Sequence, residues 1–377
     1  MKKFLAFALA ATMTLGLLAG CADKGGSADP STKPSANGGG DASGMKVVFV
    51  VTGQLGDKSF NDSAAAGVNA MSEKLGVETK IIEIGRDQTK WEPTFMDLAE
   101  SGEYDIIITN GSNAGELITT LSTEFPEQKF ILFDTEIETG AYPNVYSISY
   151  KQNEASYLAG VLAAMVTTSD MPNANPEKKI GFVGGEVHPI ISDFLVGYVE
   201  GALSVDPEIK VYVSYIGSWD NTAQGKEVAL AQYNQGVDII FPAAEQAGLG
   251  CVDAAVEQNK YIIGVDSDQA MLFQGVSEDK ANAILTSVLK EVGNSLIRAV
   301  EMDQKGTLPW GGYESLGLAE NGVGIAKNEY FEANLPQDIK DAIVAANEEV
   351  SSGAVTVTSA LGGNGDAAQK VIDSAAP

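Results

Sequence analysis

Residues 47–53 read Val-Val-Phe-Val-Val-Thr-Gly, a short apolar run that stops at a glycine. A similar run returns 133 residues later, and two further apolar runs recur at nearly the same offset. The matched pairs are 47–53 with 180–185, 103–108 with 236–241, and 130–134 with 261–266. Three landmarks at one spacing indicate a duplicated half, and the period is far too long for a solenoid repeat.

The apolar runs are continuous, rich in Val and Ile, and separated by helical patterns at 67–75, 115–125, 194–203 and 247–256. Continuous runs are typical of strands that are covered on both faces, and their alternation with helices predicts parallel sheets. We therefore expect an α/β fold with two Rossmann-like lobes joined by a hinge. Ligands of open parallel sheets bind beyond the carboxyl ends of the strands, so two facing lobes predict a shared cleft.

The chain continues past the second half with a strand pattern at 283–288, a helical pattern at 291–302, a turn-rich stretch at 306–312, and a further strand and helix. These returns between lobes resemble type I periplasmic binding proteins. The predicted division is 46–150 with 270–305 for lobe 1, 151–269 with 306–360 for lobe 2, and 361–377 as a peripheral tail.

The N-terminus predicts export. Lys2 and Lys3 precede an apolar stretch too short for a comfortable membrane span, as in a signal peptide covering residues 1–20. Leu-Ala-Gly-Cys at 18–21 resembles the lipobox of bacterial lipoproteins, which implies lipidation of Cys21; the alternative is an ordinary secretory signal with a chance cysteine. Residues 21–45 are too poor in apolar side chains to fold and are expected to form a flexible tether. We expect the body to lie on the extracytoplasmic face of the cell membrane.

Composition limits the chemistry. The 51 acidic against 24 basic residues give a net charge of −27, which argues against contact with nucleic acid. One histidine, His188, weakens proposals of metal or His-based catalysis, and Cys251 is expected to be a buried structural thiol. An enzyme such as a nucleoside hydrolase is therefore not expected, and neither a catalytic residue, a metal nor a cofactor is predicted.

The first strand is followed at 57–61 by Asp-Lys-Ser-Phe-Asn, and the loop lacks the spacing of a Walker motif. This motif resembles the signature of the basic membrane protein family of lipoproteins, the purine-nucleoside-binding components of ABC transporters. Further similar motifs follow in order at 157–160, 184–185 with 189 and 194–197, 217–219, 247–250, 264–269 and 285–290. The resemblance covers roughly residues 46–330.

The resemblance implies a nucleoside held between aromatic rings, with polar groups on its edges. It assigns Asp57 and Asn61 to the base, Asp134 and Asp266 to the ribose hydroxyls, and Lys290 with the Gly248 backbone to the rest of the sugar site. A carboxylate suits a ribose because it accepts hydrogen bonds from hydroxyl donors. The alternative for the two strand-end aspartates is that each caps the next helix.

Phe60 and Phe194 occupy corresponding places in the two halves, so the pair could sandwich a flat base, or each could be a core residue of its helix. Trp91 and Trp219 are further candidate rings. The sequence departs from the family at Ala64–Ala66, where members often carry an aromatic residue. Either another ring such as Trp91 replaces it, or the pocket takes a different planar solute such as riboflavin.

Together these features predict a lipid-anchored solute-binding protein of an ABC importer. It would capture a purine nucleoside of the guanosine, inosine or adenosine class and deliver it to permease and ATPase subunits. A membrane-tethered sensor with the same fold is the alternative.

We expect Cys21→Ser to release the protein from the membrane without changing ligand binding, because the sulfur is the acyl attachment point and residues 22–44 are too polar to anchor the chain. Fractionation of cells after a salt wash checks this. A variant that stayed with the membranes would contradict the lipobox interpretation.

Overall fold

The structure is a computed structural model that describes residues 44–377. The predicted signal peptide, Cys21 and nearly all of the predicted tether lie outside the described residues. Within residues 44–377 we find no helix with the length and hydropathy needed to span a bilayer.

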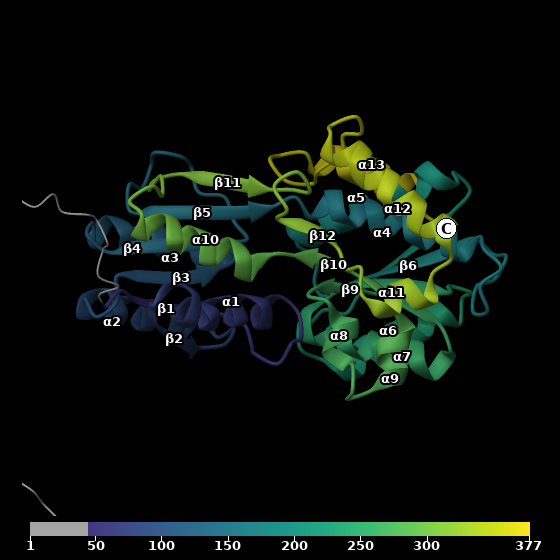
Figure 1. Cartoon of the computed structure of the whole chain (residues 1–377), viewed down its shortest axis with the longest axis horizontal. Coiled ribbons are helices and arrows are strands. Elements are labelled where there is room, and N and C mark those ends of the chain that lie inside the picture. The colour runs from purple at the N-terminus through teal and green to yellow at the C-terminus, as the bar shows by residue number, and fades with distance from the viewer. Residues whose placement is uncertain (1–43) are drawn as a thin grey trace, which may run out of the picture. The chain divides into compact units, whose positions relative to one another are not determined.

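The first sheet has six strands in the order β11-β5-β4-β3-β1-β2, all parallel (Figure 1). Its strands are β1 (Lys46–Val51), β2 (Glu78–Glu83), β3 (Ile106–Asn110), β4 (Lys129–Phe133), β5 (Val145–Tyr150) and β11 (Tyr313–Leu316). Every residue of β3 and β5 is buried, as the continuous apolar runs predicted.

The second sheet has the order β12-β10-β9-β8-β6-β7, and all its neighbours are parallel except β12 against β10. Its strands are β6 (Lys179–Gly184), β7 (Lys210–Tyr215), β8 (Ile239–Ala243), β9 (Tyr261–Asp266), β10 (Ile284–Lys290) and β12 (Val323–Ile325). Each of the first five strands occupies the same place as its counterpart in the first sheet. The duplicated half read from the sequence, and the α/β fold with two Rossmann-like lobes, are therefore confirmed.

Helices cover both faces of each sheet. Lobe 1 has α1 (Phe60–Leu75) and α10 (Val292–Gln304) on one face, and α2 (Trp91–Ser101) and α3 (Ser112–Glu124) on the other, with the short η1 (Gln88–Lys90) before α2. Alternate strand residues divide between the two faces: Val47 and Phe49 pack with α1, whereas Val48 and Val50 pack with α2 and α3. This arrangement explains why the inner strands β1, β3 and β4 are apolar on both faces, whereas the edge strand β2 keeps exposed polar residues.

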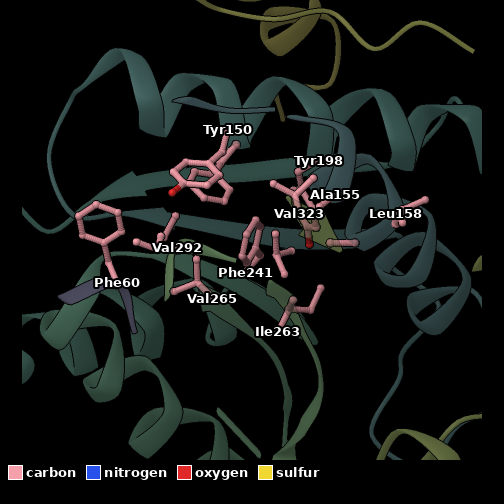
Figure 2. Packing of buried hydrophobic residues seen from close by; sticks show 14 of the residues in the cluster. Phe60, Tyr150, Ala155, Leu158, Tyr198, Phe241, Ile263, Val265, Val292 and Val323 are labelled. Carbon is pink, nitrogen blue, oxygen red and sulfur yellow. The ribbon is translucent and has the colours of Figure 1, made fainter. Parts of the chain in front are cut away.

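Lobe 2 is built the same way. One face is covered by α4 (Gln152–Thr167) and α5 (Pro189–Val205), and the other by α6 (Thr222–Tyr233), η2 (Glu245–Ala247), α7 (Gly248–Gln258), α8 (Gln269–Phe273) and α9 (Glu278–Ala283). The chain ends with α11 (Glu329–Asn334), α12 (Gln337–Ser351) on α4, and α13 (Gly365–Ser374) on α5. Figure 2 shows part of a buried apolar cluster that takes Phe60 and Tyr150 from lobe 1 and Tyr198 and Phe241 from lobe 2.

Two boundaries of the predicted lobes are wrong. Residues 284–290 form β10, which pairs with β9 and β12 in the second sheet, whereas the prediction placed 270–305 in lobe 1; of that stretch only α10 packs on lobe 1. Conversely, β11 pairs with β5 in the first sheet although 306–360 was assigned to lobe 2. The partners of a parallel strand lie far away in sequence, so local patterns identified these strands but not the sheet that each joins.

The lobes are joined by three crossing segments, which follow β5, β10 and β11. The crossings bond to one another: Lys151 N–H donates to the Leu316 carbonyl at 2.9 Å, and Glu291 N–H donates to the Gly322 carbonyl at 2.9 Å. The tail expected to be peripheral packs against the outside of lobe 2, where Ala375 is buried and its carbonyl accepts from Val211 N–H at 2.9 Å.

Candidate functional site

A cavity of about 290 Å³ is lined by both lobes, and most of its polar side chains stand just after the carboxyl end of a strand. In lobe 1 these include Asn110 at the end of β3 and Asp134 after β4; in lobe 2 they include Glu245 after β8, Asp266 at the end of β9 and Lys290 at the end of β10. This is the cleft that the strand pattern predicted, because parallel strands present their carboxyl ends along one edge of the sheet.

The structure brings seven of the ten predicted ligand-binding residues to this cavity. They are Phe60, Trp91, Asp134, Phe194, Trp219, Asp266 and Lys290. The other three, Asp57, Asn61 and Gly248, do not line it.

The Asp57 carboxylate accepts hydrogen bonds from backbone N–H groups at the start of α1. This buried carboxylate accepts from the backbone N–H groups of Ser59, Asn61 and Asp62 at 2.8–3.0 Å and from the Asn61 side-chain amide at 3.0 Å. Burial raises the pKa of Asp57, and the three backbone donors oppose that rise. The Asp-Lys-Ser-Phe-Asn motif thus shapes the first turn of α1 in this structure and presents Phe60 to the cavity.

Gly248 begins α7 behind the cavity wall, where a Cβ would lie 3.6 Å from Pro242 and 3.7 Å from Ala244. Gly248 N–H donates to the Ala244 carbonyl at 3.3 Å. In this structure its backbone contributes to the turn after β8 and not to the cavity surface.

The inner end of the cavity holds a charged cluster of Asp134, Lys290 and Asp266. Lys290, with only 2% of its side chain exposed, forms an ion pair with Asp134 of the opposite lobe. Asp266 accepts a hydrogen bond from the Ser59 hydroxyl of lobe 1. Burial raises the pKa of Asp266 to about 6, and the Lys290 charge is the main opposing influence. The cluster therefore connects both lobes through desolvated charges.

Both aspartates have a backbone conformation that is uncommon for residues with a side chain. Their φ angles are 62° at Asp134 and 61° at Asp266, in the left-handed region. Neither caps a helix; Asp268 does, as the N-cap of α8, and its side chain also accepts from Asn328 at 2.6 Å. Matching strain at corresponding places in the two lobes is the kind of local cost that proteins keep at functional sites.

Phe60 and Phe194 both lie near Lys290, whose Nζ is 5.0 Å and 5.5 Å from their ring centroids. Each ring also packs against a strand aromatic, Phe60 on Phe133 at 5.4 Å and Phe194 on Phe241 at 5.9 Å. The sequence left open whether each ring is a core residue of its helix or a ligand-contacting ring. Both interpretations hold together, because each ring is buried and also lines the cavity.

Both predicted tryptophans line the cavity. Trp91 is buried at the start of α2, and its indole N–H donates to the Gly85 carbonyl at 2.8 Å. Trp219 lies against the backbone of Gly185, where a Cβ would come within 2.5 Å of the indole ring. Ala64–Ala66, the departure from the family pattern, do not line the cavity, since Ala64 and Ala65 are buried in the core under α1.

Sequence reasoning missed several polar groups of the cavity, above all Arg86, Glu245 and His188. Arg86 follows β2 and forms an ion pair with Glu245 of the opposite lobe. His188 caps α5 by accepting from Ile190 N–H, and its other ring nitrogen is 3.4 Å from the Ser112 hydroxyl. Burial lowers the pKa of His188. The repeat contained a signal for Glu245, because 245 stands 133 positions after Ser112 and both residues follow corresponding strands.

Cys251 is fully buried and its thiol donates to the Gly225 carbonyl at 3.4 Å, so the expectation of a structural thiol is confirmed. Burial raises the pKa of this thiol to about 12, which keeps it protonated. Within residues 44–377, no group of three or more potential ligand side chains is placed to hold a metal ion.

Two parallel-sheet lobes, three crossing segments and a polar cavity between strand ends define a two-lobed solute-binding protein. The chain belongs to the family of PnrA-like ABC transporter substrate-binding proteins, because that family model matches residues 45–356. The family resemblance carried by the Asp-Lys-Ser-Phe-Asn motif is thus confirmed, and a protein of this class acts outside the cytoplasm as the solute-capturing component of its transporter.

Relatives agree. The chain is 29% identical over 371 residues to the ABC transporter nucleoside-binding protein BmpA of Lactococcus lactis, covering 95% of this chain and 99% of that protein. It is 32% identical over 287 residues to Basic membrane protein A2 of Borrelia garinii, covering 75% and 80%. Among solved structures, an ABC transporter solute-binding protein from Aeropyrum pernix matches with a TM-score of 0.76 at 24% identity, covering 88% of this chain and 99% of that one; this likeness supports the fold.

We expect Asp266→Asn to stabilise the protein without ligand at high pH. The raised pKa means that the folded state favours the protonated carboxyl, so the stability it contributes is present below the ordinary value of 3.8 and is lost as pH rises through about 6. The unfolding temperature of the variant should exceed that of the parent by a few degrees at pH 8 and match it near pH 4. A variant less stable than the parent at pH 8 would mean that the attraction between the Lys290 charge and the Asp266 carboxylate outweighs the cost of burying that carboxylate.

Proposed function

We propose that the chain captures a purine nucleoside, of the guanosine, inosine or adenosine class, in the cavity between its lobes. In this proposal Cys21 carries the lipid that holds the protein on the extracytoplasmic face of the membrane. The loaded protein then delivers its nucleoside to the permease and ATPase subunits of the transporter. No bond-making chemistry is required of the cavity residues.

The observation that carries this proposal is a charged cluster that lies next to two aromatic rings in one cavity. Asp134 and Asp266 supply carboxylate acceptors, and Lys290 supplies donors, within reach of one ligand end. Ribose hydroxyls match such a cluster because each can donate to a carboxylate and accept from an ammonium group. Phe60 and Phe194 offer apolar surfaces beside the same cluster for a flat base.

Charge supports a nucleoside over a nucleotide. Four carboxyl groups line the cavity, those of Asp134, Glu186, Glu245 and Asp266, against the two cations Arg86 and Lys290. Both cations are already paired with carboxylates. A phosphate would bring further negative charge into this partly desolvated space, whereas an uncharged sugar would not.

The relative from Lactococcus lactis supports the same ligand class, since it is described as nucleoside-binding and aligns over almost its whole length. Support for the anchor comes from the sequence alone, through the lipobox-like Leu-Ala-Gly-Cys at 18–21.

A thermal-shift panel tests the ligand class. We expect guanosine, inosine or adenosine to raise the unfolding temperature, because a ligand that binds only the folded state stabilises it by an amount that grows with the logarithm of ligand concentration relative to Kd. Free bases should shift it less, since they lack the ribose, and nucleotides less because of their charge. Larger shifts with nucleotides than with nucleosides, or a response to riboflavin alone, would contradict the proposal.

Asp266→Ala should weaken nucleoside binding by about 10- to 150-fold, the loss expected for charge-assisted hydrogen bonds of about 1.5–3 kcal/mol. Asp268→Ala is the matched control, because Asp268 is two residues away, does not line the cavity and caps α8. That control should lower the unfolding temperature slightly and leave affinity unchanged. Calorimetry that found equal affinity for Asp266→Ala and the parent would place Asp266 outside the site.

A further inference from the structure

The cavity contains a second charged pair, distinct from the inner cluster around Lys290. Arg86 comes from the loop after β2 in lobe 1, and Glu245 from the turn after β8 in lobe 2. Asp266 is close enough to both pairs to feel their charges: Lys290 favours its ionised form, and its own charge disfavours ionisation of Glu245. Both groups of charges line the same cavity, so one ligand can place its sugar at the inner cluster and its base at Arg86 and Glu245.

Only one oxygen of Glu245 is used by the protein. Both donors from lobe 1, the Arg86 guanidinium and the Asn61 amide at 3.1 Å, reach Oε2. Among residues 44–377 no donor lies within hydrogen-bonding distance of Oε1, although the residue lines the cavity and only 17% of its side chain is exposed. One carboxylate oxygen thus has acceptor capacity left toward the cavity.

Arg86 has donor capacity left as well. Its only hydrogen-bond acceptor among residues 44–377 is Glu245, which one guanidinium nitrogen reaches, and a guanidinium carries five N–H donors. The guanidinium is 5.5 Å from the Trp219 ring centroid, which holds it beside the cavity wall. The pair therefore presents a cationic donor next to an anionic acceptor.

Glu245 occupies a position that is unfavourable for the fold. Its φ of 47° lies in the left-handed region, and without a ligand, burial raises its pKa to about 8 against the opposing influence of the Arg86 charge. A ligand N–H that donates to Oε1 favours the ionised carboxylate, so binding of such a donor lowers this pKa. Besides Arg86, the charged groups that act on it are Asp57 and Asp266, both of which disfavour its ionised form. A strained residue with a costly carboxyl group is expected where binding requires it.

We propose that Arg86 and Glu245 together recognise the lactam edge of the ligand's base, a ring N–H beside a carbonyl. The carbonyl accepts from Arg86, and the ring N–H donates to Oε1 of Glu245. Inosine and guanosine carry this edge. Adenosine presents the reverse pattern, an amino donor beside a ring-nitrogen acceptor, which sets donor against donor and acceptor against acceptor. The inference rests on the proposed function and narrows it to 6-oxopurine nucleosides.

Calorimetry with inosine, 1-methylinosine and adenosine on the full chain tests this. The parent should bind inosine at least about 10-fold more tightly than either of the others, because methylation removes the N–H and adenine reverses the edge. Glu245→Gln keeps the shape of the side chain but can turn an amide donor toward the base. It should weaken inosine binding by about 10- to 100-fold while adenosine binding stays equal or improves.

Two further variants make the test specific. Glu257→Gln also removes a carboxylate from an ion pair, with Lys226 at 2.6 Å between α6 and α7, but away from the cavity, so it should change neither affinity. Arg86→Met removes the donor for the carbonyl and should lower inosine affinity more than adenosine affinity; it also serves if Glu245→Gln does not fold.

The outcomes separate the inference from the proposed function. Equal binding of inosine and adenosine by the parent, or an equal effect of Glu245→Gln on both, overturns the lactam assignment and leaves nucleoside capture standing. Riboflavin also carries a ring N–H between carbonyls. If riboflavin binds while no nucleoside does, and Glu245→Gln weakens riboflavin binding, then nucleoside capture fails but recognition of a lactam edge by Arg86 and Glu245 stands. If none of these compounds binds, both fail.

Discussion

The buried ammonium group of Lys290 is the constraint around which the two lobes meet. A lysine with almost no exposed surface needs compensation for its lost hydration, and here the compensation comes from both lobes: Asp134 pairs with it, and the rings of Phe60, Tyr150 and Phe194 surround it at 5.0–5.5 Å. Lys290 ends β10 immediately before a crossing segment, whose Glu291 bonds to Gly322 of another crossing. The position of this one charge thus links the sheet of lobe 2, the connections between lobes and the inner end of the cavity.

Much of the polar interior of the cavity works against the stability of the fold. Asp134, Glu245 and Asp266 all have left-handed backbone angles, and burial raises the pKa of both Glu245 and Asp266. Each unfavourable group is held by a partner in the other lobe, through Lys290, Arg86, Asn61 or Ser59. The interlobe contacts therefore do two things at once, since they stabilise the approach of the lobes and keep acceptor groups available beside the cavity.

The duplication places corresponding residues of the two halves around one cavity, and differences between the halves give that cavity its particular polar groups. Phe60 and Phe194, and likewise Asp134 and Asp266, stand at corresponding places, so the symmetry of the fold alone brings each pair to opposite sides of one cavity. Ser112 and Glu245 correspond as well, but only the second is ionisable. The last strands also differ, since β11 is parallel to β5 whereas β12 is antiparallel to β10. Glu245 is thus a carboxylate acceptor without a counterpart in lobe 1, and it makes the two sides of this pseudo-symmetric cavity chemically different.

The sequence by itself determined the repeat, the parallel sheets, the cleft at the strand ends and seven of the residues that line it, because these follow from local apolar runs, their spacing and the residues after each run. Only the tertiary structure decided that β10 and β11 join the sheets opposite to those expected, since parallel partners lie far apart in the chain. The tertiary structure also decided that the Asp57 carboxylate bonds to backbone N–H groups in the first turn of α1, and that Arg86 forms an ion pair with Glu245. A motif fixes which groups are present, but the competing backbone donors around Asp57 and the 159-residue separation of Arg86 from Glu245 are properties of the folded chain.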